Sequence, residues 1–190
     1  TVMGSGIQAG KIAVEEKRPA GVIGGGMHHA GKEKGGGFCI FNDVAICSTY
    51  LLDHYPTIKK IMIIDSDAHA GDGTMEIFYE RADVLFVSIH QDPRTLYPGT
   101  GFIHQTGKGE GKGFTVNIPL APYSGDQAYL YCFEEIIKPL AYEFQPDIIV
   151  RNGGSDPHWK DELTTLAVTL RGLWQFCTKI RQLANEVVQG

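Results

Sequence analysis

Apolar runs alternate along the chain with stretches whose apolar positions recur at helical spacing. Five runs are rich in β-branched and other apolar residues, and they lie at 21–26, 60–67, 83–90, 113–120 and 146–154. Continuous runs of this kind are typical of strands that are covered on both faces, as in a parallel sheet. The pattern therefore predicts five strands in a mainly parallel sheet.

Helices are predicted between these strands and before the first of them. The stretch 42–55 opens with Asn42 and Asp43, which are favourable N-cap residues, and 161–188 is entered through Asp161. Further helices are predicted over the first 17 residues, over 73–81 and over 125–144. Strands that alternate with helices predict a single α/β domain with a three-layer α-β-α architecture.

The composition argues against several classes of protein. A formal net charge of −5, without a lysine- or arginine-rich block, argues against direct nucleic-acid binding. No apolar run approaches the ~20 residues that span a bilayer, and no signal-peptide pattern opens the chain, so we expect no membrane partner. Scattered cysteines without a CxxC pair predict neither a disulfide framework nor a thiolate zinc site, and they favour a reducing cytoplasm; they are Cys39, Cys47, Cys132 and Cys177.

Histidine and aspartate gather where the predicted strands end. The ends read GGGMHH, DSDAH, SIHQ and NGGSD. Open α/β sheets bind ligands beyond the carboxyl ends of their strands. Because these residue types are poor choices for an apolar core, we expect a ligand site at this edge of the sheet.

The DSDAH segment suits a divalent metal. Asp65, Asp67 and His69 alternate, so an extended backbone would project them together. Asp156, at the end of another strand, is the natural further ligand, and an Asp-His-Asp set leaves metal positions open for water and substrate. The same residues also suit plain turns and helix caps, since Asp72-Gly73 is a turn signal and Asp156 precedes proline. The spacing alone leaves both readings open.

Two adjacent histidines, His28 and His29, follow a run of glycines. Alone, such a pair suits a solvated loop. Beside a metal it suggests a general base and an electrostatic partner for the reacting water. Such histidines need carboxylate partners that fix the tautomer, and Asp65 and Asp72 are available acids in the neighbouring loop.

Taken in order, these motifs resemble the histone deacetylase superfamily from about residue 20 to the C-terminus. They are GGGMHHA-x6-GFCIFND, DSDAHAGDGT, SIHQ-x5-YPGTG, GKG shortly before VNIPL, and GGSDPH. The superfamily includes eukaryotic zinc-dependent deacetylases, bacterial acetoin-utilisation proteins and acetylpolyamine amidohydrolases. DSDAHAGDGT and GGSDPH look more like microbial members.

The resemblance implies a role for each matching residue. One Zn²⁺ per chain would be bound by Asp67, His69 and Asp156. The tandem catalytic histidines would be His28, paired with Asp65, and His29, paired with Asp72 and acting as the general base. The substrate would be bound by Gly26, Gly37, Phe38 and Tyr97, the last two walling an acyl-lysine tunnel; apart from the resemblance, both rings suit a core. A K⁺ or Na⁺ ion would be bound by Asp65, Asp67, His69, Ser88 and Ile89.

Three departures from the family pattern matter. Ala70 replaces a histidine that follows the ligand histidine in many members, and this position is not a ligand. An early segment that the family places before the tandem histidines has no match here. The family's glycine-rich loop with the catalytic tyrosine would fall after Gly190. We therefore expect residues 1–190 to be the catalytic-core domain of a longer protein, incomplete at both ends. Alone, it would bind metal but deacetylate poorly, because a lost oxyanion donor costs ~10²–10³ in rate.

The expected activity is zinc-dependent hydrolysis of an acetyl amide to an amine and acetate. Acetyl-lysine in proteins such as histones and acetylated polyamines are both candidate substrates. Iron(II) or cobalt suits the same ligands. Two alternatives stay open: a metal-binding relative without catalysis, and a binuclear metallohydrolase of the arginase group. The oligomeric state is left open.

Overall fold

The sheet has four parallel strands in the order β3-β2-β1-β4. The computed structural model describes residues 2–188. The strands are β1 (Ile61–Asp65), β2 (Val84–Gln91), β3 (Thr115–Leu120) and β4 (Ile148–Asn152). Four of the five predicted strands are thus confirmed, within a few residues at each end. Since every pair is parallel, all the carboxyl ends lie along one edge of the sheet.

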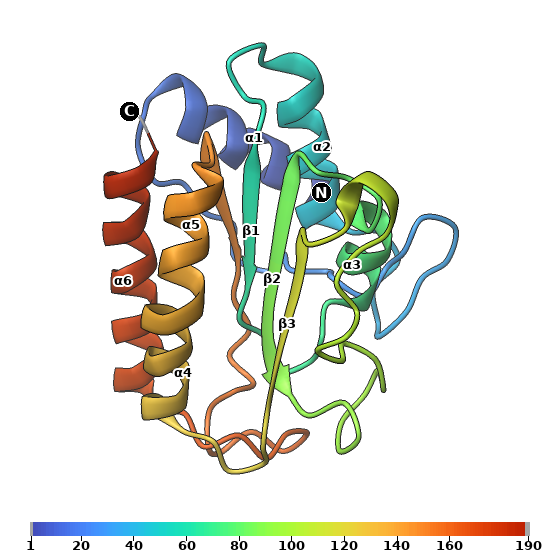
Figure 1. Cartoon of the computed structure of the whole chain (residues 1–190), viewed down its shortest axis with the longest axis vertical. Helices are drawn as coiled ribbons and strands as arrows, with labels where there is room; N and C mark the ends of the chain where they lie inside the picture. The colour runs from blue at the N-terminus through green and yellow to red at the C-terminus, as the bar shows by residue number, and fades with distance from the viewer. Residues whose placement is uncertain (1, 189–190) are drawn as a thin grey trace.

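Helices cover both faces of the sheet, which confirms the three-layer α/β architecture (Figure 1). One face is covered by α2 (Asp43–His54) and α3 (Asp72–Phe78), with α1 (Val2–Glu15) packed on α2. The other face is covered by α4 (Asp126–Cys132), α5 (Lys138–Phe144) and α6 (Leu170–Val187), and a π-helical turn over Phe133–Ile137 joins α4 to α5. In residues 2–188, no helix combines the length and apolar character of a transmembrane span.

The central strand β1 explains why the apolar runs are continuous. Met62 and Ile64 belong to the core under α4, α5 and α6, whereas Ile61 and Ile63 belong to the core under α2 and α3. Successive side chains of a strand point to opposite faces. Both faces are covered, so every position of β1 is buried and apolar until Asp65.

The predicted strand over 21–26 is wrong. This segment is irregular, and the side chain of Ile23 is fully exposed. Gly24 and Gly26 have φ angles of +89° and +90°, which a strand ladder does not accept. The glycines instead bend the loop that carries the tandem histidines.

The predicted helix over 161–188 begins later than expected. Asp161 accepts hydrogen bonds from the backbone N–H groups of Leu163 and Thr164, which forms a local turn and not a helix. The true N-cap is Thr169, whose hydroxyl accepts from Gly172 N at 3.1 Å. Between them the chain is extended, with short bridges that pair 167 and 168 with 125 and 158. β-Branched residues in 164–169 favour this extended path.

Candidate metal centre and histidine pairs

Asp67, His69 and Asp156 meet beyond the ends of β1 and β4. Their potential ligand atoms all lie within 4.8 Å of one another. Nδ1 of His69 lies 2.7 Å from Asp156 Oδ2 and 3.2 Å from Asp67 Oδ1. The strand register explains why these residues meet. Asp65 of β1 lies opposite Asn152 of β4, and the segments that follow the two strands leave the sheet at the same edge. The convergence expected from the sequence is therefore present.

The charges in this cluster fit a divalent cation. Burial raises the pKa of Asp156, with the charge of Asp67 adding to that effect and a hydrogen bond from His69 opposing it. Burial lowers the pKa of His69, but hydrogen bonds to Asp156 and Asp67 outweigh it and raise the pKa to about 9. Two crowded carboxylates thus draw a proton onto the one imidazole between them. A metal ion bound to the same three atoms would supply that positive charge.

Gly154 keeps the two carboxylates close together. A Cβ at this position would collide with the carboxylate oxygens of both Asp67 and Asp156. Glycine at 154 is therefore needed for close packing of the two carboxylates and not only for a turn. The donor set, its spacing and its partial burial all fit a metal site with one imidazole nitrogen and carboxylate oxygens.

The first histidine pair is almost completely buried. His28 Nδ1 lies 2.7 Å from Asp65 Oδ2, and the two side chains are 4% and 1% exposed. Burial lowers the pKa of His28, but the charge and hydrogen bond of Asp65, with Asp67 and Asp156, raise it to about 9. Its other ring nitrogen, Nε2, lies 3.7 Å from Asp67 Oδ1. This pair therefore borders the candidate metal ligands.

The second pair is closer to solvent. His29 Nδ1 lies 2.6 Å from Asp72 Oδ1, and the Asp72 side chain is 28% exposed. The Nε2 atoms of His29 and His28 lie 3.1 Å apart, so the two rings face one another. Both histidine–aspartate pairings expected from the sequence are present.

Two residues at the start of α2 hold the histidine loop, and the sequence reading gave them only a capping role. Asn42 Nδ2 donates to Ala30 O at 3.1 Å while its Oδ1 accepts from Ala45 N, so one side chain joins the loop to the helix. The carboxylate of Asp43 accepts from the backbone N–H groups of Gly26 and Met27 at 2.7–3.0 Å. The last two residues of the GFCIFND motif thus hold the loop that carries His28 and His29.

Asn152 was also missed by the sequence reading. It ends β4, is 4% exposed, and donates through Nδ2 to Asp65 Oδ1 at 3.0 Å. The signal was present as a polar residue at the end of an apolar run, but its partner depends on strand order. Only the pairing of β4 with β1 places Asn152 beside Asp65.

Two of the four predicted substrate-binding residues, Tyr97 and Gly37, lie against His29. The ring of Tyr97 is 5.0 Å from that of His29, edge to face, and is half exposed. Gly37 packs so tightly on His29 that a Cβ would overlap the imidazole. Phe38 is fully exposed, with a φ of +65° that costs about 1–3 kcal/mol in a non-glycine residue. Gly26 lies against Asn152, behind the pair that His28 forms.

Ser88 and Ile89, the remaining predicted cation ligands, lie buried in β2. Ser88 is the register partner of Asp65, so it lies beside the DSDAH segment. Its hydroxyl lies 2.8 Å from His90 Nδ1, and His90 Nε2 lies 2.8 Å from Gly101 O. His90 is thus a fully buried structural link to the loop that carries Tyr97, and burial lowers its pKa.

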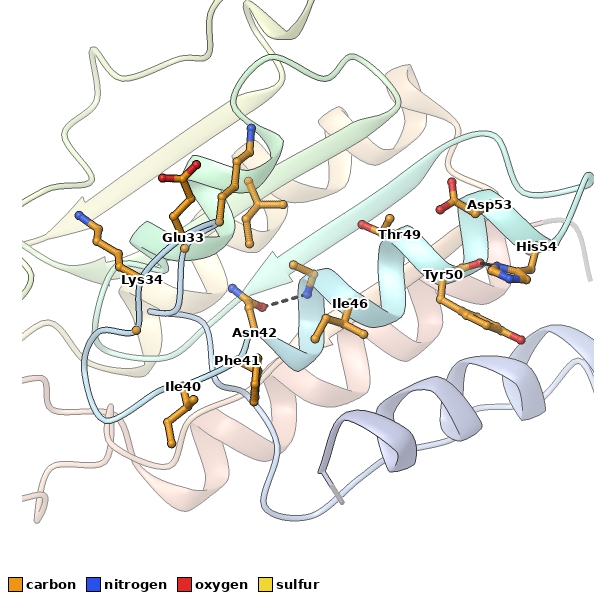
Figure 2. Close-up of a pocket in the computed structure, with 15 residues that line it drawn as sticks. Glu33, Lys34, Ile40, Phe41, Asn42, Ile46, Thr49, Tyr50, Asp53 and His54 are labelled. Atoms are coloured by element: carbon orange, nitrogen blue, oxygen red, sulfur yellow. Dashed lines mark hydrogen bonds between the residues drawn. The ribbon is translucent and has the colours of Figure 1, made fainter.

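A separate groove of about 670 Å³ lies between the 31–41 segment and α2. Figure 2 shows Glu33 and Lys34 at one end of it and Tyr50, Asp53 and His54 at the other. None of the predicted metal, catalytic or substrate residues lines it. The Asp67-His69-Asp156 cluster and this groove are therefore different places on the molecule.

Comparison with known proteins places the chain in a family. The model of the histone deacetylase domain matches residues 1–189. An acetoin utilization protein AcuC of Staphylococcus xylosus is 43% identical over 168 residues, covering 88% of this chain and 43% of that protein. The chain spans about half the length of the curated relatives it matches.

Solved structures agree with this match. An HDAC homolog from Aquifex aeolicus has a TM-score of 0.90 at 32% identity, covering 96% of this chain and 48% of that one. An acetylpolyamine aminohydrolase from Burkholderia pseudomallei has a TM-score of 0.81 at 35% identity, covering 90% of this chain and 49% of that one. On these matches, and with the fold they share, the chain belongs to the histone deacetylase domain family.

Proposed function

We propose that this chain carries the water-activating centre of a zinc-dependent deacetylase. The reaction is hydrolysis of an acetyl amide, in which water adds to the acetyl carbonyl, the C–N bond breaks, and an amine and acetate are formed. The observation that carries the proposal is the convergence of the Asp67-His69-Asp156 set with two histidine–aspartate pairs at one sheet edge. Membership of the histone deacetylase domain family supports it.

Zinc would be held by Asp67 and Asp156 through carboxylate oxygens and by His69 through Nδ1. When bound, it supplies Lewis acidity that lowers the pKa of water toward ~7 and polarises the acetyl carbonyl. A K⁺ or Na⁺ ion would lie behind this set, near Ser88 and Ile89, with Asp65, Asp67 and His69 completing its ligands. Support for that second ion is the buried position of Ser88 opposite Asp65.

The two histidines divide the proton transfers. His29 accepts the proton of the attacking water, and Asp72, at 2.6 Å from its Nδ1, keeps the ring oriented and compensates the imidazolium. His28, held by Asp65, supports the charge that develops beside the metal ligands. The departing amine leaves after one of the two imidazoles protonates it. The Nε2 atoms of the two rings lie 3.1 Å apart, so both imidazoles can reach the same reacting atoms.

The substrate is proposed to be an acetyl amide, either acetyl-lysine in a protein such as a histone or an acetylated polyamine. The exposed Phe38 and half-exposed Tyr97 offer flat apolar walls for an alkyl chain. The backbone of Gly26 and Gly37 would contact the substrate, and the lack of a Cβ lets these residues pack directly on Asn152 and His29. The similar Burkholderia structure is named as an acetylpolyamine aminohydrolase. A cytoplasmic setting is proposed from the scattered, unpaired thiols of residues 2–188.

The test uses the full-length protein with a panel of acetyl-lysine peptides and acetylated polyamines. We expect acetate release that stops when a chelator removes the metal and returns when zinc is added back. Hydrolysis that persists in chelator, or no hydrolysis of any panel member by zinc-loaded protein, would contradict the proposal. The second result would favour the alternative of a metal-binding relative without catalysis.

Elemental analysis separates the remaining alternative, a binuclear metallohydrolase. The described residues bring together a single group with metal-ligand spacing, so we expect one equivalent of catalytic metal per chain. Two equivalents that are both needed for turnover would favour the binuclear class. Iron(II) or cobalt in place of zinc would revise the metal and leave the proposed reaction unchanged.

A further inference from the structure

We propose that Asn152 is a positioning residue that fixes the Asp65 carboxylate and, through it, the imidazole of His28. The inference rests on the deacetylase function proposed above. It adds a third member to the buried pair, supplied by a different strand.

The position of Asn152 is set by the sheet. It is the last residue of β4 and the register partner of Asp65 in β1. Its backbone carbonyl accepts from the backbone N–H of Ser66 at 3.0 Å, so main-chain pairing there does not need an amide side chain. Burying an amide costs about 1–3 kcal/mol unless a hydrogen bond compensates it. The side chain at this buried position therefore calls for a polar partner.

That partner is the carboxylate of Asp65, which uses both of its oxygens. Oδ2 lies 2.7 Å from His28 Nδ1, while Oδ1 accepts from Asn152 Nδ2 at 3.0 Å and from the backbone N–H of Asp67 at 3.2 Å. The carboxylate cannot turn away from the imidazole without losing a buried hydrogen bond. Asn152 thus restrains the oxygen that His28 does not contact.

The orientation of the amide follows from charge and space. A flipped amide would place its own oxygen against the Asp65 carboxylate, which is repulsive. In the orientation found, Oδ1 faces Gly26, where an added Cβ would lie only 2.6 Å away. Glycine at 26 therefore makes room for the amide, and the histidine loop closes over it.

This arrangement also selects the tautomer of His28. Asn152 Nδ2 lies 3.1 Å from His28 Nδ1 because both nitrogens donate to the same carboxylate. When His28 is neutral, a proton on Nδ1 leaves Nε2 free to accept, and Nε2 lies 3.1 Å from His29 Nε2 and 3.7 Å from Asp67 Oδ1. The hydrogen-bond partner of one ring nitrogen decides the state of the other. Asn152 therefore acts on the reaction through Asp65 and His28.

The test compares N152L and N152D with wild type in the full-length protein. Leucine keeps the approximate volume and removes the donor, whereas aspartate keeps the shape and replaces the donor with a second negative charge. N185L and N185D, on the exposed side of α6, are matched controls for the same chemical changes. For both Asn152 variants we expect kcat to fall by about 10–100-fold. KM and zinc content should stay at the wild-type values, and both controls should match wild type.

A second measurement reads the imidazole directly. In ¹⁵N-histidine-labelled, zinc-loaded protein, with an H28F sample for assignment, His28 should be protonated at Nδ1 in wild type. N152L should give a mixture of tautomers. A wild-type His28 protonated at Nε2 overturns the proposal, even if neither variant folds. So do variants that lower only the melting temperature while kcat stays unchanged, because that is a purely structural role. If wild type hydrolyses no acetyl amide, the proposed function fails, and the imidazole signals still decide the positioning role.

Discussion

The two histidine–aspartate pairs differ in how the fold holds them. His28 and Asp65 are buried between two strands, and Asn152 and the Asp67 backbone restrain the carboxylate. His29 and Asp72 lie between a glycine-rich loop and the start of α3, with Asp72 partly open to solvent. A pair that is buried on both sides exchanges protons slowly, whereas a pair that reaches solvent through its carboxylate can pass a proton to water. The difference supports a fixed electrostatic role for His28 and a proton-accepting role for His29.

The largest effect is expected from removing the proton acceptor itself. H29F should reduce kcat by about 10²–10⁴, which is the usual contribution of general acid–base catalysis. H28F is the matched comparison and should cost less, because that ring supports charge. Steady-state kinetics on an acetyl-lysine peptide gives both values. An equal or larger loss in H28F would reverse the assignment of roles.

The carboxylate partners should rank in the opposite order. D65N and D72N each keep the side-chain shape but change what faces the imidazole, and losing such an orienting group costs about 10–100-fold in activity. We expect D65N to lie near the upper end of this range. The Asp65 carboxylate is contacted by His28 Nδ1, Asn152 Nδ2 and the backbone N–H of Asp67, and a buried amide at this position cannot accept from all three. We expect D72N to lie near the lower end, because water can replace part of the role of Asp72. Comparable losses of activity in D65N and D72N would show that burial does not distinguish the two histidine–aspartate pairs.

Stability should separate the pairs as well. D65A leaves His28 and Asn152 without their buried partner, and breaking a buried pair costs about 3–5 kcal/mol. D72A removes a partner that is 28% exposed and should cost less than D65A, because water can compensate part of the loss. Urea unfolding of zinc-loaded protein measures both values. Equal midpoints for D65A and D72A would contradict the comparison.

The smallest effect is on proton exchange. The ring N–H of His29 should exchange with water faster than that of His28, because Asp72 is 28% exposed and Asp65 is 1% exposed. Proton NMR with saturation of the water signal compares the two directly. Slower exchange at His29 would place the solvent-accessible pair at His28 instead.

The sequence predicted the sheet well and the irregular segments poorly. Ile61, Ile63 and Ile64 sit in a run whose continuous apolar character has one simple cause, which is cover on both faces. At 21–26 apolar residues lie next to glycines, and local pattern does not tell a strand from a bent loop. Asp161 has the side chain of a helix cap whether or not a helix follows it. Only the bridges that pair Ala167 and Val168 with other segments decided that the helix begins at Leu170, with Thr169 as its N-cap.

The tandem histidines and the Asp-x-Asp-x-His spacing gave a metal site as one of two readings, and the family resemblance decided between them. Strand alternation does not explain the whole motif, because β1 ends at Asp65. The pairings His28–Asp65 and His29–Asp72 were also expected, through the family resemblance, and both are present. What only the tertiary structure decided is the support around them. Asn152 lies 87 residues from Asp65 and meets it only because β4 pairs with β1 in that register. Side-chain chemistry is local information, whereas the contacts that orient it depend on strand order, which no single segment encodes.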